Sequence, residues 1–276
     1  MAVARYDIMK LLRICLFGGF VLLVILFPIV LLFVGTKQPG IDLSSALKGN
    51  WTFEPFIRLF IDSDDLAVNF RAGLLRSFEY SSIVALVAAF TAFFYVSWVT
   101  GWPRKSAIGL SFTLLTFTLL PQTYLIMPVL LIKQNLSRSL DPLVIILMIS
   151  FGVIPLIAWM LHLMDGSKIV RLQGACASDR LSISKSLAII LGESKLELLI
   201  VILLGGTIAW GNYLVPYALG SQNTYTAVVQ VATFTTNLGR DWAMICAAGF
   251  VVALPGVILG IMYILLSIRR SPFNAK

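Results

Sequence analysis

The segment "ICLFGGFVLLVILFPIVLLFV", residues 14–34, contains no charged side chain and is apolar on every face of the helix that it would form. A surface helix of a soluble protein carries a polar face at helical spacing, whereas a helix that crosses a bilayer needs about 20 consecutive apolar residues. The segment therefore indicates a membrane-spanning helix. It is also longer than the roughly 7–15 residues of a signal-peptide core, which favours an uncleaved anchor.

The rest of the chain continues this pattern, because 59% of the 276 residues are hydrophobic and only 12% are charged. A soluble domain carries about 25% charged residues. Further apolar stretches are long enough to cross a bilayer, so the predicted fold class is an all-α polytopic membrane protein with six transmembrane helices. The six predicted spans are residues 14–34, 81–99, 106–132, 143–164, 196–219 and 243–268.

The distribution of lysine and arginine predicts the orientation of these spans. If the N-terminus lies inside, 13 of the 21 basic residues fall in inner segments and 8 in outer segments. Basic residues concentrate in cytoplasmic loops, so the N-terminus and the C-terminus are both expected to be cytoplasmic. The net charge of +8 then reflects topology and contact with anionic lipids of the bilayer, and it does not indicate nucleic acid.

The longest outer loop, about residues 35–76, contains possible amphipathic turns around "FEPFIRLF". We expect it to form a solvated cap or a helix lying on the outer membrane surface. The three cysteines lie in or beside different segments, which predicts neither a structural disulfide nor a metal site.

Ionisable side chains inside a bilayer are costly and by default indicate function, yet the predicted spans hold almost none. The single histidine, His162, has no second ligand nearby, and no GxxxxGK[ST] phosphate loop occurs. We therefore expect a non-enzymatic chain with no catalytic residue, no metal and no cofactor of its own. Any ATP and magnesium would bind to a partner.

Neutral polar and aromatic side chains are concentrated in the third, fourth and fifth predicted spans, together with prolines. Proline frees a backbone carbonyl, which is tolerated where neighbours or a water-filled cavity satisfy it. Amides and aromatic rings suit a neutral hydroxylated solute, although the same residue types also serve ordinary helix packing. The candidates for a substrate pathway are Gln122, Tyr124, Trp159, Trp210, Asn212 and Tyr213.

The longest inner segment, residues 165–193, contains the polar stretch "QGACASDRLS" (173–182). A first short helix is predicted there from apolar residues that recur on one face: Ile169, Leu172 and Cys176. Ser178 and Asp179 are N-cap residue types for a second helix, "RLSISKSLAIIL". A short helix that projects into the cytoplasm fits a groove on a soluble partner, and an interfacial linker is the alternative interpretation.

Several motifs occur in the order in which one protein family has them. They are "SFEYSSIVALVAAFTAFFYVSW" followed by "GWPRK", then "LPQTYLIMPVLL", "IPLIAWMLHL", "AWGNYLVP" and "YTAVVQV…DWAMICAAGFVVALP". From about residue 70 to 266 the chain resembles the inner-membrane permease subunits of bacterial ATP-binding-cassette importers. It is most similar to the maltose-type carbohydrate-uptake branch, and the last motif is the most specific.

The resemblance implies a type I importer permease fold in the bacterial cytoplasmic (inner) membrane. Residues 1–69 would form an N-terminal anchor plus outer loop, and residues 70–276 a permease core with a coupling loop at 165–193. The implied partners are a second homologous permease subunit, two ATP-binding-cassette ATPase subunits and an extracytoplasmic solute-binding protein. Together they would move a small hydrophilic solute, with carbohydrate as the expected class, inward by alternating access. A stand-alone channel or secondary carrier, and a scaffold permease without activity, remain as alternatives.

The resemblance also aligns the family's loop signature, Glu-Ala-Ala followed by Asp-Gly, with this chain. The residues that it implies for coupling to the ATPase are Gly174, Ala175, Cys176, Asp179, Arg180 and Ser182. The family's glutamate is Gly174 here and its loop glycine is Arg180. The usual Leu-Pro after the second helix is Gly192-Glu193. The departures are thus concentrated where an ATPase would bind.

Overall fold

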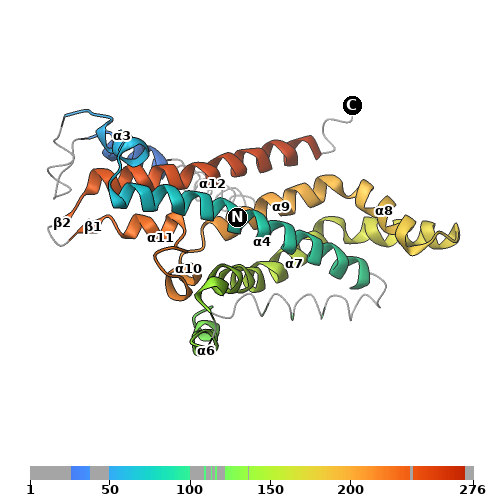
Figure 1. Cartoon of the computed structure of the whole chain (residues 1–276). Helices are drawn as coiled ribbons and strands as arrows, with labels where there is room; N and C mark the ends of the chain where they lie inside the picture. The colour runs from blue at the N-terminus through green and yellow to red at the C-terminus, as the bar shows by residue number, and fades with distance from the viewer. Residues whose placement is uncertain are drawn as a thin grey trace, which may run out of the picture. The chain divides into compact units, whose positions relative to one another are not determined.

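A computed structural model describes residues 26–37, 50–99, 122–135, 137–236 and 239–270, together with Gly109, Thr113 and Thr116. These residues are mainly helical, and three helices are long and apolar enough to cross a membrane. The three are α4 (Asp65–Val99), α7 (Asp141–Ser178) and the Trp242–Met262 part of α12 (Trp242–Arg270). Figure 1 shows these three helices. The helical, membrane-type character predicted from composition is confirmed, and the six spans and their orientation stay predictions.

Shorter elements connect the long helices. They are the helix Leu26–Gly35, α3 (Glu54–Ile61), α6 (Gln122–Lys133), the 3-10 turn η1 (Arg138–Leu140), α8 (Ile183–Glu193), α9 (Lys195–Trp210), α10 (Leu214–Leu219) and α11 (Ala227–Ala232). A two-residue antiparallel pair, β1 (Thr235–Thr236) with β2 (Gly239–Arg240), is the exception to the all-α prediction among the described residues. Residues 14–25 of the first predicted span, about half of the third predicted span, and the turn "GWPRK" lie outside the described residues.

The chain divides into two compact units. The first comprises Met1–Arg71 and Val231–Leu254, and the second comprises Ala72–Gln230 and Pro255–Lys276. All the candidate coupling and substrate-pathway residues belong to the second unit.

In the first unit, the "FEPFIRLF" turns form α3, as the sequence predicted. Leu59 on one face of α3 is fully buried, while Ile61 is exposed. The predicted outer loop ends earlier than expected, since α4 already begins at Asp65. An acidic residue in the first turn suits the positive end of the helix dipole. Arg71 on α4 donates from Nη1 to the carbonyls of Leu59 (3.1 Å) and Asp62 (2.9 Å), which satisfies the open end of α3.

The helix Leu26–Gly35 packs closely on α12 within the first unit. A Cβ at Gly35 would lie 2.8 Å from the backbone nitrogen of Ala247, so only glycine permits this approach. Ala247 and Ala248 of α12 are fully buried. Small residues at helix contacts are the usual way in which membrane helices approach each other.

The second unit is organised around α7, along which α9 packs. Its largest fully buried side chains come from α4, α7, α8, α9 and α10: Phe93, Ile145, Ile149, Ile157, Leu161, Ile169, Ile190, Ile200 and Leu219. Between membrane helices such side chains contribute through van der Waals packing, because lipid tails are as apolar as the side chains themselves. Pro155 lies inside α7 without ending it.

The fifth predicted span, residues 196–219, is interrupted. α9 ends at Trp210 and α10 begins at Leu214, with Gly211, Asn212 and Tyr213 between them. Pro216 explains the position of the break, since a proline ring clashes with the carbonyl four residues earlier, which here belongs to Asn212. The prediction of one continuous helix was therefore wrong at this point.

In the second unit, an ion pair and a hydrogen bond of Lys133 connect the end of α6 with the start of α7 and the end of α10. The Lys133 ammonium at the end of α6 lies 3.1 Å from Oδ1 of Asp141, the first residue of α7. It also donates a hydrogen bond to the carbonyl of Leu219, the last residue of α10. Asp141 is only 2% exposed. The contact fixes the α6–η1–α7 turn against the end of the interrupted span.

Candidate functional site

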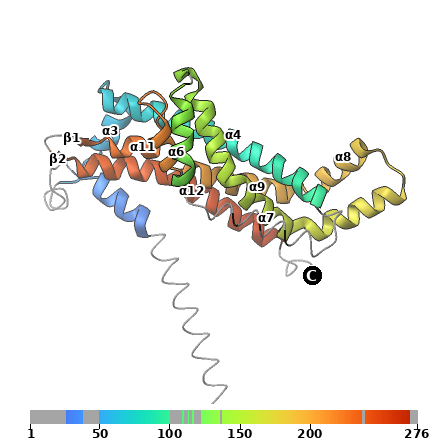
Figure 2. The same cartoon turned by 90° about the horizontal axis from the view of Figure 1, so that it is seen from below.

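The candidate coupling loop is a helical hairpin made by the end of α7 and by α8. Figures 1 and 2 show α8 turning back from the end of α7, with the connecting turn at the tip of a projection. The sequence predicted a separate short helix before this turn, but α7 continues unbroken to Ser178. The predicted apolar face is confirmed, since Ile169 is fully buried, Cys176 is 5% exposed and Leu172 packs against the core.

The turn has the hydrogen bonds of a Schellman motif, the usual way in which a helix ends in a left-handed residue. The Arg180 N–H donates to the Ala177 carbonyl (3.1 Å), and the Leu181 N–H donates to the Cys176 carbonyl (3.0 Å). Arg180 has φ = 52°, the left-handed conformation that favours glycine. An arginine therefore occupies a backbone position that suits glycine.

The predicted N-caps of the second helix were wrong by a few residues. Asp179 follows the last residue of α7, and the Ser178 hydroxyl donates back to the Gly174 carbonyl (2.9 Å), so both belong to the end of the first helix. Ser182 is the N-cap of α8, with extended backbone angles and no side-chain capping bond. Ser178 and Asp179 have the residue types of N-caps, but the chain turns at the left-handed Arg180, so α8 begins only at Ile183.

The six coupling candidates lie together on the hairpin but differ in exposure. Cys176 is buried and belongs to the hydrophobic core of the hairpin. The others are exposed on the end of α7 or on the turn: Gly174, Ala175, Asp179, Arg180 and Ser182. A Cβ at Gly174 would meet nothing within 4 Å, so the surface is open where the family has glutamate.

The most direct contact among the substrate-pathway candidates is a hydrogen bond between two amides. Asn212 Nδ2 donates to Gln122 Oε1 (3.2 Å), and Asn212 Oδ1 accepts from the Val215 N–H (3.2 Å). The amide pair, Gln122 with Asn212, therefore joins the start of α6 to the break between α9 and α10. Interrupted helices in transporters often place their freed polar groups at the solute site.

Gly152 on α7 makes room for this pair, and the sequence analysis missed it. A Cβ at that position would lie 2.5 Å from Gln122 Nε2. Nothing in the local sequence separates Gly152 from other glycines in apolar helices, because its role depends on a side chain thirty residues away.

The aromatic candidates differ in exposure. Tyr213 stacks on Tyr217, with ring centroids 5.2 Å apart and planes 15° apart. Tyr124 is 74% exposed, so it lies on the surface of the described part of the second unit. Trp159 and Trp210 are half-buried in α7 and α9. The structure thus joins two of the six predicted pathway residues, Gln122 and Asn212, by a hydrogen bond.

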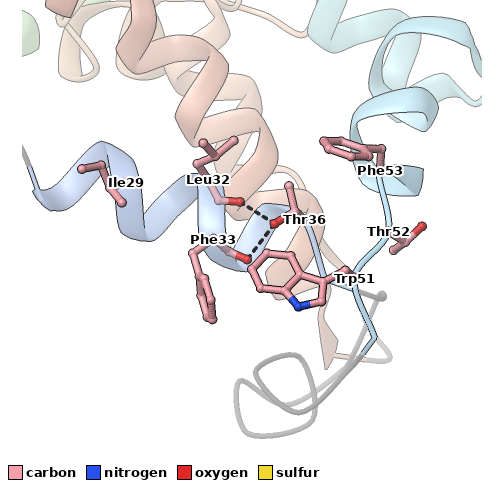
Figure 3. A pocket seen from close by; sticks show the side chains of 7 residues that line it. All are labelled: Ile29, Leu32, Phe33, Thr36, Trp51, Thr52 and Phe53. Atoms are coloured by element: carbon pink, nitrogen blue, oxygen red, sulfur yellow. Dashed lines mark hydrogen bonds between the residues drawn. The ribbon is translucent and has the colours of Figure 1, made fainter.

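An apolar pocket of about 370 Å³ lies in the first unit, beside the end of the helix Leu26–Gly35. Its lining residues are Ile29, Leu32, Phe33, Thr36, Trp51, Thr52 and Phe53. Figure 3 shows the hydrogen bonds that the Thr36 hydroxyl donates to the carbonyls of Leu32 and Phe33, each 3.0 Å long. The Lys37 ammonium lies 4.0 Å from the Trp51 ring centroid, within cation–π range. The sequence analysis did not predict this pocket.

No group of three histidine, cysteine or carboxylate side chains suited to a metal occurs within the described ranges. His162 is half-buried in α7.

No protein-family model matches the chain, and no curated protein matches it significantly.

Proposed function

We propose that this chain is the transmembrane permease subunit of an ATP-driven importer in a bacterial cytoplasmic membrane. Partner subunits would hydrolyse ATP, and a small hydrophilic solute, with carbohydrate as the expected class, would move inward by alternating access. The chain would contribute six spans with both termini inside, and a hairpin that contacts an ATPase.

The observation that carries this proposal is the α7–α8 hairpin. A mere linker between spans has no need of a buried face and a closed turn, yet Ile169 and Ile190 are almost fully buried and the turn is hydrogen-bonded. At the same time the tip is open, and Ile183 in the first turn of α8 is 81% exposed. A rigid helix with an exposed apolar side chain is a surface that fits a groove on a soluble partner.

The amide pair supports a neutral solute. Gln122 and Asn212 together offer amide donors and acceptors without a net charge, and they lie where the fifth predicted span is interrupted. In this proposal, movement of the hairpin accompanies a change of the helices that carry these amides. A ligand or partner shifts such an equilibrium only through contacts that differ between the two states.

The test is purification of the full chain from its native membrane under mild conditions. We expect an ATPase and a second permease to co-elute, with ATP hydrolysis that a solute stimulates. Asp179→Ala at the hairpin tip is expected to reduce this stimulation, whereas Arg171→Ala, an exposed change on α7 away from the turn, is not.

Two results would contradict the proposal in different ways. If the chain elutes alone and transports a solute alone, it is a channel or secondary carrier. If the assembly forms but hydrolysis is insensitive to Asp179→Ala, the hairpin is not the coupling element.

A further inference from the structure

The helices α8 and α9 are separated by one residue, Ser194. Its N–H donates to the Ile190 carbonyl of α8 (2.9 Å), and its carbonyl accepts from the Leu198 N–H of α9 (2.9 Å). Ser194 is fully buried. Ser194 therefore takes part in the backbone hydrogen bonding of both helices, through its N–H for α8 and through its carbonyl for α9. Any bending between α8 and α9 has to occur at this residue.

A lysine from α7 lies against this junction. The Lys168 ammonium donates to the carbonyl of Glu193, the last residue of α8, and lies 3.8 Å from Oε1 of Glu197 in the first turn of α9. It is also 4.0 Å from Oδ1 of Asp165 on its own helix. We call Asp165, Lys168, Glu197 and the Glu193 carbonyl the Lys168 cluster.

Each contact of the cluster has a separate physical reason. The last carbonyls of a helix have no partner inside that helix, and a cation at this end interacts favourably with the helix dipole. Glu197 lies at the opposite, N-terminal end of α9, where a carboxylate is favoured. One ammonium thus contacts the carbonyl end of α8 and a carboxylate in the first turn of α9 at the same time.

The two carboxylates of the cluster are shielded from water, whereas the Lys168 side chain is 31% exposed. Asp165 is 1% exposed and Glu197 is 5% exposed. Buried carboxylates need a cation or hydrogen bonds to remain charged. Removing the ammonium would take away a cation that lies within 4.0 Å of both carboxylates and would open the hydrogen bond at the end of α8.

We propose that Lys168 is a positioning residue that makes α8 and α9 move as one rigid body. Displacement of the hairpin tip would then reach the far end of α9, next to Asn212 of the amide pair, instead of being absorbed by bending at Ser194. The inference rests on the proposed function, because it names the residue through which the hairpin acts on the solute site.

A distance measurement on the full chain tests the rigid body itself. Spin labels are placed at two exposed positions, Ile183 on α8 and Leu199 on α9, after the three native cysteines are replaced. We expect a narrow distance distribution in the parent protein and in Lys168→Arg, which keeps the charge. Lys168→Met is expected to broaden it.

The matched control is Lys195→Met, which removes an exposed lysine from the first turn of α9 outside the cluster. Its distribution is expected to stay narrow. If Lys168→Met fails to fold, Glu197→Gln removes one charge of the cluster from the other side and is expected to broaden the distribution as well. Unchanged widths in the variant that folds would overturn the inference.

The second measurement is transport per ATP hydrolysed in the purified assembly after reconstitution into lipid vesicles. We expect Lys168→Met to keep basal hydrolysis but to lose about tenfold in transport per ATP, a size usual for coupling between two sites. Lys168→Arg is expected to restore it. Equal efficiency in all variants would overturn the role in coupling.

The two measurements separate the failure of this inference from that of the proposed function. If no ATPase accompanies the chain, the proposed function fails, and with it the role of Lys168 in coupling. The distance distributions still decide whether the Lys168 cluster holds α8 and α9 together.

Discussion

Arg180 adopts a backbone conformation that its own side chain disfavours. Its φ of 52° allows the Schellman turn at the hairpin tip, and the position of this turn determines where α8 begins. The left-handed conformation costs a residue with a Cβ about 1–2 kcal/mol, a cost that glycine avoids. The arginine side chain is exposed, so it recovers little of this cost through packing.

We therefore expect Arg180→Gly to stabilise the protein by about 0.5–1 kcal/mol, because relief of the backbone strain exceeds the extra flexibility of glycine in the unfolded chain. The midpoint of thermal unfolding in detergent measures this effect. Asp179→Gly is the control, since Asp179 has φ = −80° and gains nothing from glycine. Destabilisation by both changes would contradict the account of the turn.

Gly152 acts through the amide pair that it accommodates. The hydrogen bond between Gln122 and Asn212 is expected to couple the two side chains by about 0.6 kcal/mol, a usual value between membrane helices. A Cβ at residue 152 would push Gln122 Nε2 away. A double-mutant cycle of Gln122→Ala and Asn212→Ala, followed by unfolding in a denaturing detergent, should lose its coupling in a Gly152→Ala background.

Gly205→Ala is the matched control for this prediction. A Cβ there meets only side-chain carbons of Ile157 and Val153, at 3.5 to 3.6 Å. The coupling between Gln122 and Asn212 should persist in that background. Its loss in both backgrounds would point to a general loosening of the helices.

At the scale of elements, the residues at the end of α8 decide its length. Gly192 and Glu193 lie in its last turn, and Ser194 is its C-cap. A proline at this point would remove a backbone donor and clash with the preceding turn. Because the last turn contains no proline, α8 and α9 are separated by one residue.

Gly192→Ala should stabilise α8 by about 1 kcal/mol, because a Cβ at that position would meet nothing within 4 Å and alanine has the higher helix propensity. Gly192→Pro should cost about 3 kcal/mol or more and open the end of α8. Hydrogen exchange of the α8 amides measures both effects. Equal exchange in the two variants would show that α8 does not continue through residue 192.

At the same scale, the sequence predicted two helices with a turn between residues 165 and 193, but it placed the turn boundaries incorrectly. The sequence predicted a first short helix that includes Cys176 and a second helix with Ser178 and Asp179 as caps, whereas α7 continues to Ser178 and α8 begins at Ile183. The decisive feature is the left-handed conformation of Arg180, which residue type does not indicate because arginine rarely adopts it.

For the whole molecule, two charged groups of α7, Asp141 at its start and Asp165 thirteen residues before its end, limit the part that we expect to lie in a bilayer. Asp141 and Asp165 are both buried, and each lies within 4.0 Å of a lysine ammonium. The 24 residues of helix that separate them correspond to about 36 Å at 1.5 Å per residue, against about 30 Å for the hydrocarbon core. The part of α7 beyond Asp165 therefore belongs outside that core.

Lys133→Met should destabilise the protein by about 3–5 kcal/mol, because it leaves the buried Asp141 carboxylate without its cation. Adding Asp141→Leu should recover most of this loss, since an apolar pair of similar size needs no charge compensation. Unfolding in denaturing detergent measures both. If the double variant is no more stable than Lys133→Met alone, the ion pair is not the reason for the loss.

The sequence by itself determined the helical, membrane-type character of the chain, because apolar length and charge depletion are local properties that no tertiary contact can reverse. It also indicated the hairpin segment, the apolar face of Ile169 and Cys176, and the polar residues Gln122 and Asn212. Only the tertiary structure showed which distant groups meet: Gly152 against Gln122, Lys133 against the Leu219 carbonyl, and Lys168 at the α8–α9 junction. Such contacts depend on how helices pack, and their members are separated by too many residues for any periodicity to reveal them.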